Sequence, residues 1–262
     1  MYAGGVDPTE DSAITNESKR QQALETITRN IEQHGHHIYI VLGAPCPRYA
    51  YTIGIGQRLG SELILAGASF YVKDEVVEII NGLAAQLGPH STWNDIHLTI
   101  GQRGSFSLRR ADRTWANKLM IGALDYYRTD EVEAFQIVPD ETHWTVDVPD
   151  MSDPWSATSE PVWQWLHNPW QFSVPSNSVA MTDLGALHGE MITEVVRWEE
   201  DYWEAYAGSG PDVLHEEQRP VPLGTLLGAD ESLGAIVELR VEHGLWREAD
   251  AVWHAWGKVG DG

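Results

Sequence analysis

The chain has 262 residues, of which 42% are apolar, and a formal net charge of −22 at pH 7. This composition supports a folded core, and the length allows one large domain or two ordinary ones. No apolar run approaches 18 residues, so we expect no membrane span or membrane partner, and the charge disfavours nucleic acid as a partner.

The negative charge is concentrated in the second half of the chain. Residues 1–128 carry 12 Lys and Arg against 13 Asp and Glu, whereas residues 129–262 carry 5 against 26. Such a field attracts cationic partners. Solubility alone is the alternative explanation.

Two features favour a cytoplasmic protein. The single cysteine, Cys46, excludes an internal disulfide framework and suits a reducing compartment. Residues 1–18 are polar and lack the apolar segment of a secretory signal. We expect residues 1–17 to be a flexible leader.

Residues 18–140 are expected to form an N-terminal α+β domain. Its periodicity predicts, in order, a helix at 17–33, a strand at 37–42, strands at 49–55 and 62–68, a helix at 72–87, a strand at 96–100, a helix at 112–127 and a strand at 133–138. The strands at 49–55 and 62–68 are almost continuously apolar, which is typical of strands that are covered on both faces.

Residues 141–178 combine prolines with Trp144, Trp155, Trp163, Trp165 and Trp170. Exposed tryptophan lowers solubility, so we expect an ordered strap packed across the protein rather than a free linker.

Residues 179–262 are expected to form a small acidic α+β unit. A strand pair is predicted at 191–198 and 202–206, and a helical segment at 220–239 broken near Gly228. The whole chain is therefore predicted to be an α+β protein with a mixed or antiparallel sheet and packed helices, followed by the strap and this unit.

The ends of the two apolar strands carry the first candidate site. Arg48, Tyr49, Tyr51, Thr52 and Glu62 cluster there in the sequence. Glu62 is either a buried carboxylate paired with Arg48, which would be structural, or a general base with a raised pKa. In an enzyme, Glu62, Tyr51 and Arg48 would be the catalytic candidates, and Tyr49 and Thr52 would contribute to binding.

A second candidate surface lies in the acidic unit. Glu199 and Glu200 stand beside Trp198, Tyr202 and Trp203, and aromatic anchors within an anionic surface suit a basic protein partner. Alternatively, these aromatic residues form the core of the unit and the acids face water.

Two further groups carry weaker signals. His34 and His36 could converge on a metal, but no recognised metal motif accompanies them, and Cys46 is either a turn residue or a reactive thiol beside Arg48. The basic residues Arg103, Arg109, Arg110, Arg113 and Lys118 either dock onto the acidic half, face solvent or bind an anion. No phosphate-loop or dinucleotide motif occurs, so we expect no cofactor.

The run from Pro47 to Ile55, followed by Glu62 to Gly67 and preceded by a helix and a strand, resembles the bacterial domain of unknown function 4262 family. The resemblance covers about residues 20–140, and the Trp-rich acidic part is similar to an extension found in some such proteins. The resemblance implies no particular activity or catalytic residue.

From these observations we predict a cytosolic interaction module that binds a basic protein, in the manner of an immunity or inhibitor protein. The alternatives are an enzyme with a pocket at Arg48, Tyr51 and Glu62 or a histidine metal site, and a nucleic-acid mimic.

Overall fold

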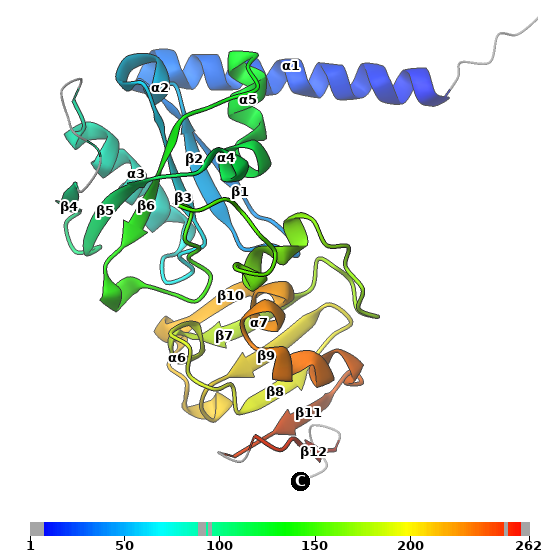
Figure 1. The fold of residues 1–262 in the computed structure, drawn as a ribbon. Coiled ribbons are helices and arrows are strands. Elements are labelled where there is room, and N and C mark those ends of the chain that lie inside the picture. Colours follow the sequence, from blue (N-terminus) through cyan, green and yellow to red (C-terminus); the bar gives the residue numbers. More distant parts are fainter. Residues whose placement is uncertain (1–7, 89–92, 94–95, 249–250, 258–262) are drawn as a thin grey trace, which may run out of the picture.

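The computed structural model describes residues 8–88, 93, 96–248 and 251–257 and shows an α+β protein, as predicted. Twelve strands among the described residues form two separate mixed sheets of six strands each, called sheet A and sheet B (Figure 1). Sheet A belongs to the N-terminal domain and sheet B to the C-terminal unit.

Sheet A contains β1 (His37–Val41), β2 (Tyr49–Ile53), β3 (Glu62–Ala66), β4 (His97–Thr99), β5 (Ser105–Arg110) and β6 (Ala134–Pro139). Its spatial order is β1-β2-β3-β6-β5-β4. Only β3 and β6 pair in parallel, and the other pairs among the described strands are antiparallel. β6 therefore joins the β1–β2–β3 group to the β4–β5 hairpin.

Both faces of sheet A are covered, as the continuously apolar strands predicted. On one face, Tyr51 and Ile53 of β2 contact a core that also contains Ile27, Trp115 and Ala123. On the other face, the alternate residues Ala50, Leu63 and Leu65 pack against α3, whose buried side chains are Val76, Ile79, Ile80, Leu83 and Ala84. The strand alternation thus divides one run of apolar residues between two cores.

Five helices belong to the N-terminal domain: α1 (Pro8–His34), α2 (Ile55–Leu59), α3 (Lys73–Gln86), α4 (Arg113–Leu119) and α5 (Ile121–Tyr127). α1 begins at Pro8, so residues 8–17 continue the helix instead of belonging to a leader, and its first part extends beyond the sheet (Figure 1). The single helix predicted at 112–127 is interrupted at Met120, whose backbone is not helical. The strand predicted at 49–55 ends at Ile53, where α2 follows.

Sheet B contains β7 (Val179–Asp183), β8 (Glu194–Arg197), β9 (Tyr202–Tyr206), β10 (Gln218–Pro222), β11 (His243–Trp246) and β12 (His254–Trp256) in the order β10-β7-β9-β8-β11-β12. The predicted strand pair at 191–198 and 202–206 corresponds to β8 and β9. The remaining elements are α6 (Leu184–Leu187), α7 (Leu223–Ala229) and the 3-10 helices η3 (Gly210–Asp212), η4 (His215–Glu217) and η5 (Glu231–Glu238).

Residues 141–178, which we call the Trp/Pro segment, contact both parts of the protein. The segment contains η1 (Glu141–His143) and η2 (Pro161–Leu166). Trp144, Trp163 and Trp170 each pack against a different one of the three apolar cores. Trp165 donates its indole N–H to the carbonyl of Gly224 in α7 (3.1 Å). The segment therefore joins the N-terminal domain to the C-terminal unit through side-chain packing as well as through the chain.

Among the described residues, no helix combines the length and apolar character needed to cross a membrane.

Candidate functional site

The three residues proposed for catalysis lie in three different places. Glu62 is the first residue of β3, whereas Arg48 lies beside the other end of that strand, where its carbonyl accepts the amide of Gly67 (2.9 Å). Tyr51 lies between these ends, in the core that faces α5. The prediction of one pocket containing Arg48, Tyr51 and Glu62 is therefore wrong.

Glu62 is fully buried, and its carboxylate accepts four hydrogen bonds. Thr52 donates its hydroxyl to Oε2 (2.6 Å), and the amides of Gly54 and Gly56 donate to Oε1 (2.9 and 2.8 Å). Tyr127 donates its hydroxyl to the same Oε1 atom. The carboxylate thus connects β3 to the β2–α2 turn and to α5, and the pairing with Arg48 that we expected does not form.

Burial raises the pKa of Glu62, while the hydrogen bonds from Thr52 and Tyr127 oppose this shift. A raised pKa is what the general-base hypothesis requires. However, four protein donors already surround the carboxylate, and the side chain has no exposed surface for a substrate. The geometry is that of a buried structural carboxylate.

Arg48 lies at a cavity of about 420 Å³ between the two parts of the protein. Its Nη2 atom donates to the carbonyls of Tyr71 (2.7 Å) and Ala68 (3.3 Å) in the loop that follows β3. No ion pair involves Arg48 among the described residues. Burial lowers the pKa of Arg48, and the positive charge of Arg219 lowers it further.

Tyr49, Tyr51 and Thr52 have packing roles. The ring of Tyr51 stacks between those of Tyr39 (5.5 Å) and Tyr49 (6.3 Å), and its hydroxyl accepts the amide of Gly122 (3.1 Å). Tyr49 and Tyr51 also line an open groove beside α5. Thr52 is fully buried and serves Glu62.

The weaker candidates, His34, His36 and Cys46, lie in two places. His34 and His36 border the same surface hollow, where His36 is hydrogen-bonded to Asn81 (2.9 Å). The described residues contain no group of three side chains able to hold a metal ion. Cys46 is buried, which raises the pKa of its thiol to about 12 and keeps it protonated.

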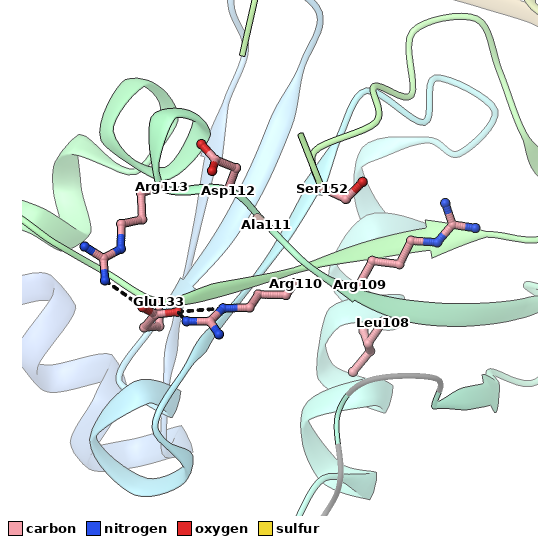
Figure 2. A pocket seen from close by; sticks show the side chains of 8 residues that line it. All are labelled: Leu108, Arg109, Arg110, Ala111, Asp112, Arg113, Glu133 and Ser152. Atoms are coloured by element: carbon pink, nitrogen blue, oxygen red, sulfur yellow. Dashed lines mark hydrogen bonds and ion pairs between the residues drawn. The ribbon is translucent and has the colours of Figure 1, made fainter. Parts of the chain in front are cut away.

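Three arginines of the basic cluster form ion pairs within their own domain. Arg103 pairs with Glu75 and Glu78 in α3. Around the hollow drawn in Figure 2, Arg110 and Arg113 converge on Glu133, whereas Arg109 points away from it. Arg113 also pairs with Glu131, and Lys118 lies over the ring of Trp155. Of the three alternatives for this cluster, docking onto the acidic half is not what these ion pairs show, because their glutamates belong to the N-terminal domain.

The acidic candidates lie at one end of sheet B. Glu199 and Glu200 are exposed in the turn between β8 and β9, next to the exposed Asp201. Arg197 donates to the carbonyls of Glu199 (3.2 Å), Glu200 (2.7 Å) and Leu239 (2.7 Å). One guanidinium group therefore holds this turn beside the end of η5, where Glu238 is also exposed. We call Glu199, Glu200, Asp201 and Glu238 the acidic edge.

The aromatic candidates differ in burial, and one belongs to the core whereas the others lie beside the acidic edge. Trp203 is fully buried, under the guanidinium of Arg197 at 4.7 Å from the ring centre. Trp198 and Tyr202 are half-buried beside the acidic turn. Burial raises the pKa of Tyr202, and the carboxylates of Glu204 and Glu199 add to this shift. Trp203 is thus a core residue, and Trp198 and Tyr202 border the acidic edge.

Sequence reasoning missed four residues of these sites. Tyr127 completes the Glu62 network, and Arg219 reaches from β10 to donate to the carbonyl of Phe70 (2.7 Å). Asp147 is fully buried and accepts the hydroxyl of Ser69 (2.6 Å). In the sequence, nothing but a charged or hydroxyl side chain marked these residues. Each contact joins residues at least 65 positions apart, so the neighbouring residues in the chain gave no indication of the partner.

Comparison with known proteins gives a match for the N-terminal domain only. A family model described as "Domain of unknown function (DUF4262)" matches residues 30–144, a range that contains every strand of sheet A. No curated protein and no solved structure gives a match. The match over residues 30–144 therefore confirms the resemblance to the DUF4262 family that the aromatic strand and the Glu62-Leu63 pair suggested.

Proposed function

We propose that the protein is an interaction module that binds a basic protein through the acidic edge of its C-terminal unit. The observation that carries this proposal is the arrangement around Arg197, which holds the turn of Glu199 and Glu200 beside the end of η5. Its hydrogen bonds go to backbone carbonyls, so the neighbouring carboxylates stay directed to solvent.

The carboxylates of the acidic edge make no stabilising contact with other described side chains. None of the four forms an ion pair or a side-chain hydrogen bond among the described residues, and all four are exposed. Three cations of the basic cluster, Arg103, Arg110 and Arg113, are paired with glutamates of the N-terminal domain. Uncompensated charge of one sign attracts a partner of the opposite sign and accelerates its association.

Apolar surface beside the charges supports a protein partner. Val241, in the turn before β11, is 39% exposed, and Trp198 and Tyr202 border the acidic turn. Interface energy is concentrated in such apolar and aromatic contacts, whereas the charges steer the approach. An immunity or inhibitor protein that blocks a basic partner in a 1:1 complex is one form of this function. The single buried cysteine suits action in the cytoplasm.

Charge reversal tests the proposal. We expect the native chain to capture a basic protein from a lysate of its own cells at low salt, as a 1:1 complex that dissociates as salt rises. The triple variant Glu199→Lys, Glu200→Lys and Asp201→Lys should lose this protein, with the loss measured by quantitative mass spectrometry and by titration with the purified partner.

A matched control changes the same amount of charge elsewhere in the unit. Asp212, Glu216 and Glu217 are exposed on the loop before β10, and their triple lysine variant should keep the partner. Equal losses in both variants would show that net charge alone attracts the protein. Capture of no basic protein, or of one that the first variant retains, would contradict the proposal.

A further inference from the structure

The cavity between the N-terminal domain and the C-terminal unit has the size of a small-molecule site. Its volume is about 420 Å³, within the range common for ligand pockets. One wall comes from the β1–β2 turn and the loop between β3 and α3, and the other from β7, β10 and the residue before β7. Interfaces between folded parts are a frequent place for such pockets.

The charge of this cavity is opposite to that of the protein. Arg48, Lys73 and Arg219 line it, and no Asp or Glu does. This concentration of cations occurs in a chain with a net charge of −22. Arg48 comes from the N-terminal domain and Arg219 from the C-terminal unit, so the two guanidinium groups approach the cavity from different sides.

Both guanidinium groups are held in place by backbone carbonyls. Arg48 donates to the carbonyls of Ala68 and Tyr71, and Arg219 donates to that of Phe70, so both bind the same loop. The charges of Asp147 and Glu75 act on Arg48, and those of Glu75 and Glu217 act on Arg219, but none of these carboxylates forms an ion pair with either group among the described residues. In hydrogen bonds to described residues, Arg48 uses only Nη2 and Arg219 only Nε and Nη1, which leaves N–H groups of both for a ligand.

The loop that both arginines bind is itself fixed. Asp147 accepts the amide of Ser69 (3.2 Å) and its hydroxyl (2.6 Å). Ala68 has a φ of 58°, which is unusual for a residue other than glycine. A Cβ on Gly67 would lie 2.0 Å from the carbonyl oxygen of Asp147, so only glycine fits there. A fixed loop with an unusual backbone is typical of a ligand site rather than of a simple connection.

The remainder of the cavity is apolar. Leu42 and Val72 line it and are 70% and 46% exposed, although both are large apolar side chains. Val179, Val221 and Pro222 extend the apolar wall on the side of the C-terminal unit. A ligand with an apolar body would cover Leu42 and Val72, which water now contacts.

We infer that this cavity binds a small organic acid, with its carboxylate between Arg48 and Arg219 and its apolar body against Leu42 and Val72. Arginine donates paired hydrogen bonds to a carboxylate, and such charge-assisted bonds are among the strongest in proteins. The ligand would also offset the repulsion between these two half-buried cations. This site is separate from the acidic edge and does not depend on the protein partner.

Calorimetric titration with decanoate tests the inference. We expect one molecule of decanoate per chain. Decanol has the apolar body without the charge. Its affinity should be at least about tenfold lower than that of decanoate, because a charge-assisted hydrogen bond contributes at least that factor. Acetate, which has the charge without the body, should also bind more weakly than decanoate.

Two aspartate variants locate the binding site. Leu42→Asp adds a negative charge at an exposed position of the cavity, and Ile121→Asp makes the same change at an exposed position on α5. Decanoate affinity should fall about fivefold or more in the first variant, from charge repulsion, and stay unchanged in the second. Arg219→Gln should weaken decanoate without affecting decanol. No binding of decanoate, equal binding of decanol, or equal losses in the two aspartate variants would overturn the inference.

Discussion

Thr52 on β2 and Glu62 on β3 are joined by a side-chain hydrogen bond, in which the Thr52 hydroxyl donates to Glu62 Oε2 (2.6 Å). The same hydroxyl accepts the amide N–H of Leu63 (2.9 Å). Together with Gly54, Gly56 and Tyr127, Thr52 and Glu62 form a closed hydrogen-bond network inside the N-terminal domain. The carboxylate stabilises the fold here, and substitution at Glu62 separates this role from a catalytic one.

We expect Glu62→Gln to fold with a free energy of unfolding about 1–2 kcal/mol below the native value. The amide oxygen can keep the bonds from Gly54, Gly56 and Tyr127, and Thr52 Oγ1 can accept from the amide nitrogen, but the Thr52 hydroxyl then loses its acceptor. Glu62→Ala should lose about 3 kcal/mol or more, because each unsatisfied buried donor costs roughly 1–3 kcal/mol. Urea unfolding measures both. A glutamine variant as unstable as the alanine variant would contradict this description of the network.

The pH dependence of stability should differ between the native chain and Glu62→Gln. Burial raises the pKa of Glu62, so the folded protein holds its proton to a higher pH than the unfolded chain, whose carboxyl has a pKa of about 4.3. The stability contributed by this group is complete at acidic pH and decreases as pH rises from that value through the raised pKa. Urea midpoints should show the native chain losing stability relative to the variant over this interval. The opposite slope would mean that the four donors outweigh burial.

Gly122 and Tyr51 should show strong coupling. A Cβ at position 122 would lie 2.6 Å from the Tyr51 hydroxyl oxygen, so Gly122→Ala should cost about 1–3 kcal/mol. In a Tyr51→Phe background the obstructing oxygen is absent, and the same alanine should be neutral or stabilise by up to about 1 kcal/mol, as alanine does in a helix. A double-mutant cycle from urea unfolding measures the coupling. Additive effects would contradict the close contact.

Gly224 should be required for the contact between the two parts of the protein. A Cβ there would lie 2.4 Å from the carbonyl oxygen of Pro45 and 2.9 Å from Trp165 Nε1. Gly224→Ala should cost about 1–3 kcal/mol and increase hydrogen exchange in the Trp/Pro segment. Gly234→Ala is the matched control, because nothing lies within 4 Å of a Cβ at that position. Equal effects of the two substitutions would show that this contact contributes little.

The periodic elements of the N-terminal domain could be predicted because burial determines their pattern. The apolar face of the helix predicted at 72–87 is the buried face of α3, and the apolar strands are covered on both sides. β5 was missed although Phe106 and Leu108 alternate inward, because its arginines suggested a charged surface. Residues 220–222 of β10 were wrongly included in the helical segment predicted at 220–239, because Pro220 and Pro222 argued against a strand in the interior of a sheet. β10 is an edge strand, where one side needs no backbone donor.

The sites were less predictable than the elements because tertiary packing determines them. Neighbours in the sequence suggested that Arg48, Tyr51 and Glu62 act together, but an antiparallel pair places Arg48 and Glu62 at opposite ends of β3. Their partners come from distant segments: Tyr127 from α5 for Glu62, and the loop shared with Arg219 for Arg48. The acidic turn was identifiable because Glu199 and Glu200 lie next to one another in the chain.

The position of β6 also determines when the N-terminal domain can form during synthesis. β6 is the last strand of sheet A in the chain but lies between β3 and β5. Until residues 134–139 leave the ribosome, the β1–β2–β3 group and the β4–β5 hairpin are separate pieces, and β3 has an unpaired edge. A nascent chain stalled before Ala134 therefore exposes an apolar strand, which is the kind of surface that chaperones bind and that aggregation begins from.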